Sequence, residues 1–241
     1  MQILEKALRS AGPIIDARFD GEEMQEAHIA EAEFRNCRFS NCTFDEATFR
    51  ACRFYGCVFD HCSFREATIE DCQFCEGETG CEWRYCDLSK AEIRRSNLSL
   101  NTMIGSTAYL TAFSDCSAAG IRLDLETQRK IRTQSIAGGV TFRTCKLQYA
   151  AFSPADFRES VFESCDLRDA SLAGCNLTQA SFRGSSLHNI DFTGSMLDHA
   201  DLSHASFDAL DLTSLASFHA AVVTRDQHEA ILSSLGLLTA D

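Results

Sequence analysis

The chain has little of what linkers, membrane spans and secretion signals require. It contains only 2 Pro among 241 residues and no Ser-rich or Gly-rich tract, so nothing indicates a disordered linker. No apolar run reaches the length of a membrane span, and the first residues include Glu5, Lys6 and Arg9, which do not suit a signal peptide. We therefore expect a cytoplasmic protein without membrane contact.

Catalytic motifs are also missing. The sequence has no phosphate-binding glycine loop, no HExxH and no Gly-x-Ser-x-Gly elbow. Its 7 His are dispersed along the chain. We therefore expect no enzyme activity, no cofactor and no metal.

What the sequence does contain is a repeat of five residues. Between Glu31 and Phe74, a large apolar residue stands at every fifth position, with a small Ala or Cys two residues before it. Helices repeat at 3.6 residues and strands at 2, so a strict period of five indicates a solenoid made from one small unit. A left-handed β-helix acyltransferase would need a period of six.

The repeat continues in three frames. In the first frame, the large central residues, here called centres, run from Ile14 to Phe74. After a slip of one residue, the second frame runs from Trp83 to Ala118, and the third contains only Phe and Leu from Phe142 to Leu212. Of the 18 Phe in the chain, all but Phe218 fall on centres. We expect each centre, and the residue two before it, to point inward while the other three positions face water.

This pattern resembles the pentapeptide-repeat family, whose consensus A(D/N)LXX is visible as AEFRN, ADFRE, CDLRD, CNLTQ, IDFTG and ADLSH. The resemblance covers roughly residues 14–215. It implies an all-β fold, a right-handed quadrilateral β-helix in which four pentapeptides complete one coil. We expect a single domain, 1–241, with a cap (1–12), coils (14–118) with a loop at 75–82, a long loop (119–139), further coils (140–215) and a C-terminal helix and tail (224–238).

The 13 Cys raise the alternatives of disulfides and zinc. All except Cys75 stand two residues before a centre, where they would serve as small core residues. Thiols stacked on successive coils point in parallel, and a reducing compartment disfavours disulfides. The spacing of Cys72, Cys75 and Cys81 leaves a metal or redox sensor as an alternative. Because His199 and His204 are five residues apart, we expect them on adjacent sides of the rod, without a shared metal.

Two interruptions break the repeat. The first, CEGETG at residues 75–80, has two Gly and two acids and indicates a loop at a corner. The second, residues 119–139, carries 2 acids and 4 bases on a chain of net charge −13. Its centre, ETQRKIRTQ, has a composition that permits a helical turn or two. Such an insert either folds back onto the acidic rod or contacts a partner.

The interruptions resemble those of the Qnr quinolone-resistance proteins within the family. The run CQFCEGETGCEW is similar to the first Qnr loop, and FRTCKLQYAAF is similar to the segment after the second, although the second interruption is longer here. The resemblance implies that both loops contact a topoisomerase. The candidate partner-binding residues are Glu76, Glu78, Thr79, Arg129, Lys130 and Ile131.

Charge is uneven in the third frame. No Lys or Arg occurs between Arg183 and Arg225, although Asp191, Asp198, Asp201, Asp208 and Asp211 do. Asp just before a centre belongs to the consensus and is expected to bond the local backbone. Asp191 and Asp211 are 20 residues apart, which predicts carboxylates arrayed along the rod. An acidic rod suits proteins that normally bind nucleic acid, and in the Qnr and mycobacterial MfpA proteins such a surface is interpreted as imitating duplex DNA.

The C-terminal segment predicts a helix. Residues 224–227 have the sequence of a capping box, and Gly236 is the expected stop. An apolar stripe is formed by Ile231, Leu232, Leu235, Leu237 and Leu238. The helix either covers its own last coil or, as the family resemblance implies, joins two copies in a twofold dimer.

Taken with the resemblance, these features indicate a non-enzymatic, DNA-mimicking homodimer. Its partner would be DNA gyrase or topoisomerase IV, which it would modulate or protect from quinolones or gyrase-targeting toxins, without binding nucleic acid itself. The alternative is a general interaction scaffold or effector whose partner is not a topoisomerase.

Overall fold

In the computed structural model, which describes residues 3–8, 12–131 and 134–237, each five-residue unit forms one side of a coil. In one such unit, Glu33–Arg35 form β4, the Phe34 side chain points inward with 1% exposed, and Asn36 turns the chain with φ 53°. A positive φ recurs at the corner of most units. Because a Cβ makes that conformation costly for large apolar residues, most corners hold polar residues or Gly.

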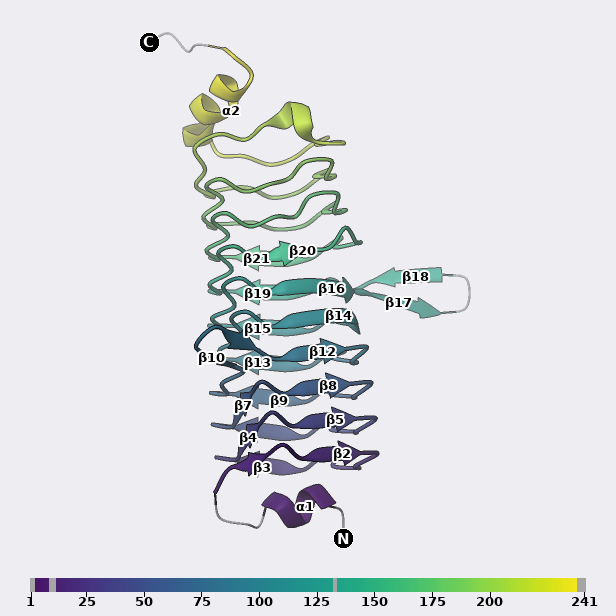
Figure 1. The fold of residues 1–241 in the computed structure, drawn as a ribbon. Coiled ribbons are helices and arrows are strands. Elements are labelled where there is room, and N and C mark those ends of the chain that lie inside the picture. The colour runs from purple at the N-terminus through teal and green to yellow at the C-terminus, as the bar shows by residue number, and fades with distance from the viewer. Residues whose placement is uncertain (1–2, 9–11, 132–133, 238–241) are drawn as a thin grey trace.

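Successive coils pair in parallel. Ile14 pairs with Phe34 and Phe34 with Phe54, so 20 residues, or four units, complete one coil. Further bridges carry this side of the rod on to Ser206. The result is a parallel β-solenoid with its described ends at opposite ends of the rod (Figure 1), which confirms the predicted fold class.

Two parallel sheets of seven strands form opposite sides of the N-terminal coils. The first contains β2 (Arg18–Asp20), β5 (Arg38–Ser40), β8 (Val58–Asp60), β12 (Glu82–Arg84), β14 (Thr102–Thr107), β16 (Arg122–Glu126) and β20 (Ala151–Phe152). The second contains β3 (His28–Ala30), β6 (Thr48–Arg50), β9 (Thr68–Glu70), β13 (Glu92–Arg94), β15 (Ala112–Ser114), β19 (Thr141–Arg143) and β21 (Val161–Glu163). A third side begins with β1 (Ile14–Ile15), β4 and β7 (Arg53–Tyr55).

The predicted centres form the core. All are buried except Ile14 and Leu212, which lie in the end coils and are half-buried. The ring centroids of Phe34 and Phe54, and of Phe54 and Phe74, are 5.0 Å apart with nearly parallel planes. Such ring pairs add roughly 0.5–1.5 kcal/mol beyond their area burial.

The last coil corrects the predicted register. Met196 bridges Ser217, a step of 21 residues rather than 20, so Phe218 occupies a centre that the three frames left out. The slip follows the 3-10 helix η1 (Leu212–Ser214). Because no further coil covers Phe218, its side chain remains 44% exposed.

Both interruptions form antiparallel hairpins. The first contains β10 (Cys75–Glu76) and β11 (Thr79–Gly80). The second contains β17 (Gln128–Ile131) and β18 (Gln134–Ala137) and projects from the rod (Figure 1). The helical turn considered for this insert is therefore wrong. Strand pairing inside the hairpin and anchoring of its stem, described below, outweigh the local helix propensity.

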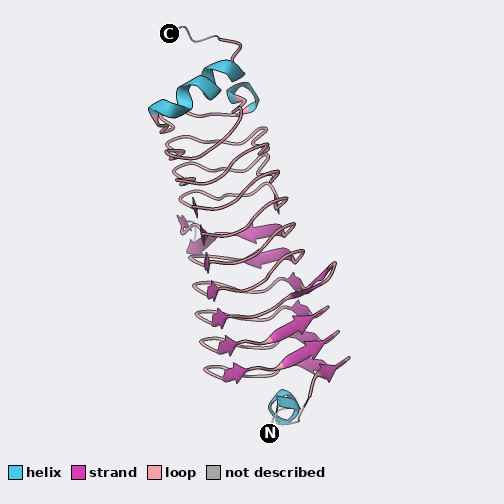
Figure 2. Ribbon diagram, turned by 90° about the vertical axis from the view of Figure 1, so that its left-hand side faces the viewer, coloured by secondary structure: helices cyan, strands magenta, loops and turns pink. Residues whose placement is uncertain are grey.

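Short helices lie across the two ends of the rod (Figure 2). Helix α1 (Ile3–Leu8) buries Leu4 against the first coil, and the Leu4 N–H donates to Glu22 Oε2 at 3.3 Å. At the other end lie η2 (Arg225–Gln227) and α2 (His228–Ser234). Among the described helices, none has the length and apolar character needed to cross a membrane.

Candidate partner-binding surfaces

The first hairpin lies against the rod. Arg35 makes two hydrogen bonds to the Glu76 carboxylate, of 2.7 and 3.1 Å, and its guanidinium carbon lies 4.7 Å from the centre of the Tyr55 ring. Gly80 packs so closely that a Cβ there would lie 2.3 Å from the Leu100 carbonyl oxygen. Of the three predicted contact residues, Glu76 is therefore engaged by Arg35, whereas the exposed Glu78 and Thr79 face solvent.

The second hairpin, β17–β18, is called the arm below. Its stem is held by the coil that follows it, because the Thr127 hydroxyl donates to the Asp156 carbonyl and the Gln128 amide donates to the Asp156 carboxylate. Directly after β18, Gly138 lies against Tyr109, whose ring would overlap a Cβ at that position. The arm is thus anchored to two coils and held away from the body.

The arm presents a basic residue beside a groove. Arg129 is exposed and lines a groove of about 380 Å³ together with Arg65, Lys90 and Tyr109 from the rod. Arg65 and Lys90 are already paired with carboxylates at 2.8 and 2.6 Å.

The three predicted residues of the insert all lie in β17. Ile131 pairs with Gln134 and Arg129 with Ile136, so Ile131 is the nearer of the two to the end of the arm. The side chains of Lys130 and Ile131, and residues 132–133, lie outside the described part of the structure.

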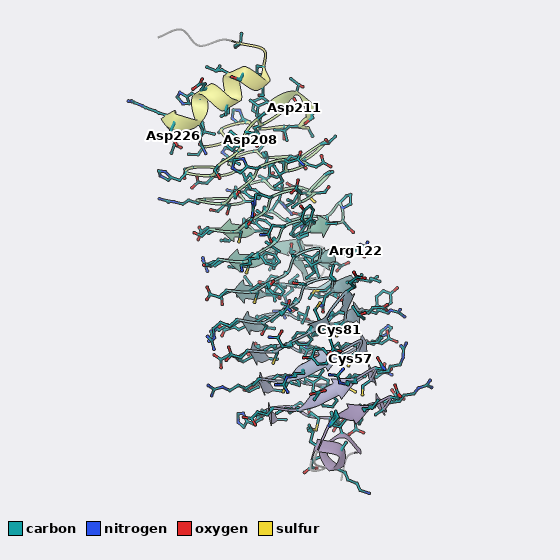
Figure 3. All side chains as sticks on the ribbon, turned by 60° about the vertical axis from the view of Figure 1, so that its left-hand side comes forward. Cys57, Cys81, Arg122, Asp208, Asp211 and Asp226 are labelled. Carbon is teal, nitrogen blue, oxygen red and sulfur yellow. The ribbon has the colours of Figure 1, made fainter. Side chains whose placement is uncertain are left out.

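The five Asp predicted to form an acidic surface do not lie in one stripe. Asp191 continues the side of β20, and Asp201 continues the side of β21. Asp198 follows Met196 on a third side, and Asp208 follows Ser206 on the fourth. Asp211 precedes η1 at the last coil (Figure 3). The carboxylates therefore surround the C-terminal part of the rod.

The consensus Asp residues bond the local backbone as predicted. Asp191, Asp201 and Asp211 each accept the N–H of the residue two positions later, at 3.0, 2.8 and 2.9 Å. The N–H and hydroxyl of Thr193 lower the pKa of Asp191, and the hydroxyl and N–H of Thr213 lower the pKa of Asp211. These hydrogen bonds keep the carboxylates charged without adding a compensating positive charge.

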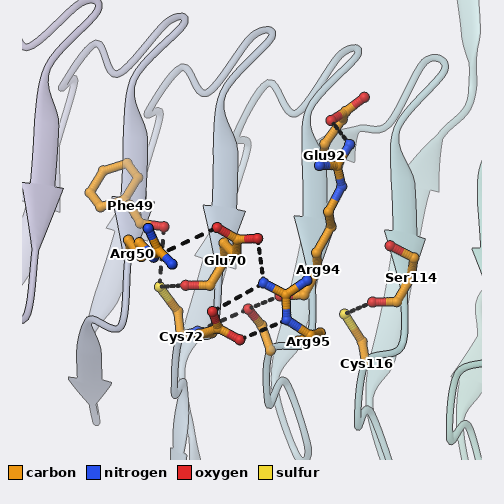
Figure 4. Close-up of polar contacts among 11 residues, drawn as sticks. Phe49, Arg50, Glu70, Cys72, Glu92, Arg94, Arg95, Ser114 and Cys116 are labelled. Atoms are coloured by element: carbon orange, nitrogen blue, oxygen red, sulfur yellow. Dashed lines mark hydrogen bonds and ion pairs between the residues drawn. The ribbon is translucent and has the colours of Figure 1, made fainter.

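Charges on the N-terminal coils are arranged differently. Along the side of β9 and β13, Arg95 contacts both Glu70 and Asp71, and Arg50 lies 3.9 Å from Glu70 (Figure 4). The hydrogen bonds from Arg95 lower the pKa of Asp71. Here acids and bases on neighbouring coils neutralise one another.

The cysteines belong to the core. All except Cys75 are buried, and their thiols donate to backbone carbonyls, as Cys57 does to Phe34 at 3.5 Å. Burial raises the pKa of Cys175 to about 11 and also raises the pKa of Cys75. Within the described residues, no three potential metal ligands come together. The alternative of a sensor at Cys72, Cys75 and Cys81 therefore gains no support.

The C-terminal helix covers part of the last coil. The predicted capping box at Thr224 and Gln227 is present. The Gln227 amide, 4% exposed, also donates to the carbonyls of Leu202 and Ala205 at 2.8 and 2.6 Å, a role that the sequence did not indicate.

The predicted apolar stripe divides into two parts. Ile231 packs on the core and Leu232 is half-buried, whereas the side chains of Leu235 and Leu237 are 43% and 52% exposed. Leu238 lies outside the described residues. Exposed apolar area thus remains at this end of the rod.

Sequence and structure comparisons agree on the repeat. Residues 34–76 match a family model described as pentapeptide repeats (9 copies), and residues 136–221 match a pentapeptide repeat region. Together these segments cover more than half of the chain. No curated protein matches the sequence.

Several solved structures share the fold. Two are structures of QnrB1, described as a plasmid-mediated fluoroquinolone resistance protein, with TM-scores of 0.68 and 0.64 at 19% and 20% identity. The matches cover 96% and 94% of this chain and all of the trypsin-treated chain and of the full-length chain, respectively. HetL from the cyanobacterium Nostoc sp. strain PCC 7120, involved in heterocyst differentiation regulation, matches with a TM-score of 0.68 at 15% identity, covering 92% of this chain and 94% of HetL. At these identities the likeness is one of fold.

Proposed function

This chain belongs to the pentapeptide-repeat family, and we propose that it is a non-enzymatic protein that binds DNA gyrase or topoisomerase IV in place of DNA. In this role it modulates the topoisomerase or protects it from quinolones or gyrase-targeting toxins. The proposal takes its direction from the fold shared with QnrB1, a fluoroquinolone resistance protein. It requires a cytoplasmic protein that does not itself bind nucleic acid.

The observation that carries the proposal is an acidic rod with carboxylates on all sides of its C-terminal part. Nine steps between coils, from Ile14 to Ser206, span about 43 Å at a strand spacing of about 4.8 Å. A DNA duplex of that length carries roughly 25 charges. The net charge of −13 is therefore about half that of DNA. Such a rod can occupy a DNA-binding surface. With fewer charges, it should compete for that surface less strongly than a duplex of equal length.

The hairpins supply what a uniform rod lacks, which is a distinctive surface for one partner. Glu78 and Thr79 on the first hairpin and Arg129 on the arm are exposed where the repeat is interrupted. The arm is basic, so it suits an acidic patch beside the DNA-binding surface. A twofold dimer through Leu235 and Leu237 would extend the acidic rod and bury the apolar area that α2 leaves exposed.

A supercoiling assay tests this function. Gyrase is assayed with relaxed plasmid at increasing protein concentrations, with and without ciprofloxacin. We expect micromolar protein to change supercoiling or to reduce drug-stabilised DNA cleavage. A variant in which residues 128–137 are replaced by a short Gly-Ser linker should lose much of this effect. No change in supercoiling or cleavage at any concentration argues against the proposal.

The second candidate is a scaffold or effector with a different partner. It is favoured by the match to HetL, which equals the better QnrB1 match in TM-score although HetL is described by a developmental role. Capture from lysate separates the two functions. Recovery of gyrase subunits supports the first, whereas a different stable partner without gyrase supports the second.

A further inference from the structure

Two histidines that the sequence separates lie together on the last two coils. The ring centroids of His199 and His219 are 5.7 Å apart and their planes are inclined by 88°. Their positions are fixed by the backbone, because the His199 N–H donates to the His219 carbonyl at 2.8 Å. Both side chains are exposed, so their ring nitrogens are open to solvent species.

We propose that His199 and His219 form a binding site for a divalent cation of the zinc, nickel or copper class. Neutral imidazole is a common ligand for these ions. With a metal–nitrogen distance of about 2.0–2.1 Å, each ring centre lies roughly 3.2 Å from the ion, so two rings that share an ion have centres within roughly 6.4 Å. The observed separation of 5.7 Å lies inside that limit. Because the rings meet edge to face, binding requires these exposed side chains to turn until a nitrogen of each ring faces the ion.

The carboxylate beside the pair adds a favourable charge. Asp198 accepts the backbone N–H of His219 at 2.6 Å and the Ser217 hydroxyl at 2.9 Å. A carboxylate has about four lone-pair positions, so these two bonds leave others for a water bound to the ion. Water would complete the coordination of an ion held by two imidazoles.

The other histidines offer no such pair. His61 lies 3.0 Å from Asp60 and beside the Tyr85 ring, and His188 lies 3.0 Å from Asp208. Within the described residues, His199 and His219 form the single ring contact between two imidazoles. An ion held there would connect the last coil to the one before it. It would therefore stabilise the C-terminal end in proportion to its occupancy. This inference does not depend on the proposed topoisomerase partner.

Titration calorimetry with Ni²⁺ and with Zn²⁺ tests the site in the full-length protein after treatment with a chelator. The variants are His199→Ala and His219→Ala, and the matched control is His204→Ala, an exposed corner histidine on another side. We expect one ion per chain, with affinity lowered about tenfold or more in both site variants and unchanged in the control. The ion should also raise the thermal midpoint of the wild type and the control but not of the site variants.

Two results would overturn the proposal. One is equal affinity in all four proteins, which would place the ion elsewhere. The other is the absence of both binding heat and a thermal shift in the wild type.

Discussion

The N-terminal and C-terminal coils use the same repeat for different purposes. The coils of the first frame have Phe at most centres and pair through strands on some sides and isolated bridges on others. The coils beyond β21 have Leu at most centres and pair through isolated bridges (Figure 2). Several acids in the first part are paired with Arg on adjacent coils, whereas Asp191 and Asp211 accept hydrogen bonds from their own turns. The inward positions therefore determine the fold and leave the outward charge free to vary.

The largest effect should come from the aromatic column. Phe54 is stacked between Phe34 and Phe74, so Phe54→Ala removes two ring contacts as well as core volume. We expect a loss of about 3–5 kcal/mol in the free energy of unfolding, measured by urea denaturation. The matched change Leu177→Ala, at a fully buried centre without a stacked ring, should cost less than Phe54→Ala, within the range of about 2–5 kcal/mol for such changes. A larger loss at Leu177 would contradict the contrast between the two sets of coils.

The next effect concerns the C-terminal end. Gln227→Leu removes the donor to the Ala205 carbonyl and one of the two donors to the Leu202 carbonyl, and it should cost about 1–3 kcal/mol. Hydrogen exchange should show faster exchange confined to the last coils and α2. Glu229→Gln, at an exposed position of α2, is the control and should change neither the free energy of unfolding nor the exchange rates. Unchanged protection in Gln227→Leu would show that the side chain does not hold this end.

A smaller effect should appear in the pH dependence of the protein's stability. The pKa of Asp191 in the folded protein lies below its ordinary value. Its contribution to the free energy of unfolding is therefore fully present above the unfolded pKa of about 3.9, and it is lost as the pH falls through the pKa of the folded state. Asp191→Asn should therefore reduce the difference between unfolding midpoints at pH 7 and pH 3. Ser186→Ala serves as an uncharged control on another side. An unchanged difference in Asp191→Asn would contradict the role of the turn hydrogen bonds.

The smallest effect on global stability should come from the first hairpin. Glu76→Gln weakens the contact with Arg35, and both side chains are substantially exposed. We expect no measurable change in the unfolding midpoint but faster proteolysis within residues 75–80. Glu78→Gln, which alters the neighbouring exposed acid, is the control. A clear loss of global stability in Glu76→Gln would mean that this hairpin supports the coils as well as lying on them.

The sequence was sufficient for the inward positions because a period of five leaves them few alternatives. Phe34, Cys57 and Phe162 are buried as predicted. The Asp turn bonds were also predictable, since they join residues two positions apart. Phe218 escaped the prediction because the last coil contains one extra residue, although the small Ala216 before it was available as an indication.

Features that depend on contacts between distant residues were not predictable. The arm was considered as a helical turn because ETQRKIRTQ contains good helix formers. Its actual form depends on Tyr109 and Asp156, which lie outside the insert. The contact of His199 with His219 was likewise not predicted, although the two residues are 20 positions apart, the length of one regular coil. The sequence predicted Asp191 and Asp211 as part of a stripe, but not the distribution of the five carboxylates around the rod.

Competition with DNA for gyrase is the sharpest test of DNA mimicry. A fluorescently labelled duplex is bound to gyrase, and the fluorescence anisotropy is followed as the protein is added. We predict that the protein displaces the duplex at micromolar concentration and that added salt weakens this competition. A duplex that stays fully bound while the protein fails to bind gyrase would contradict the proposed function.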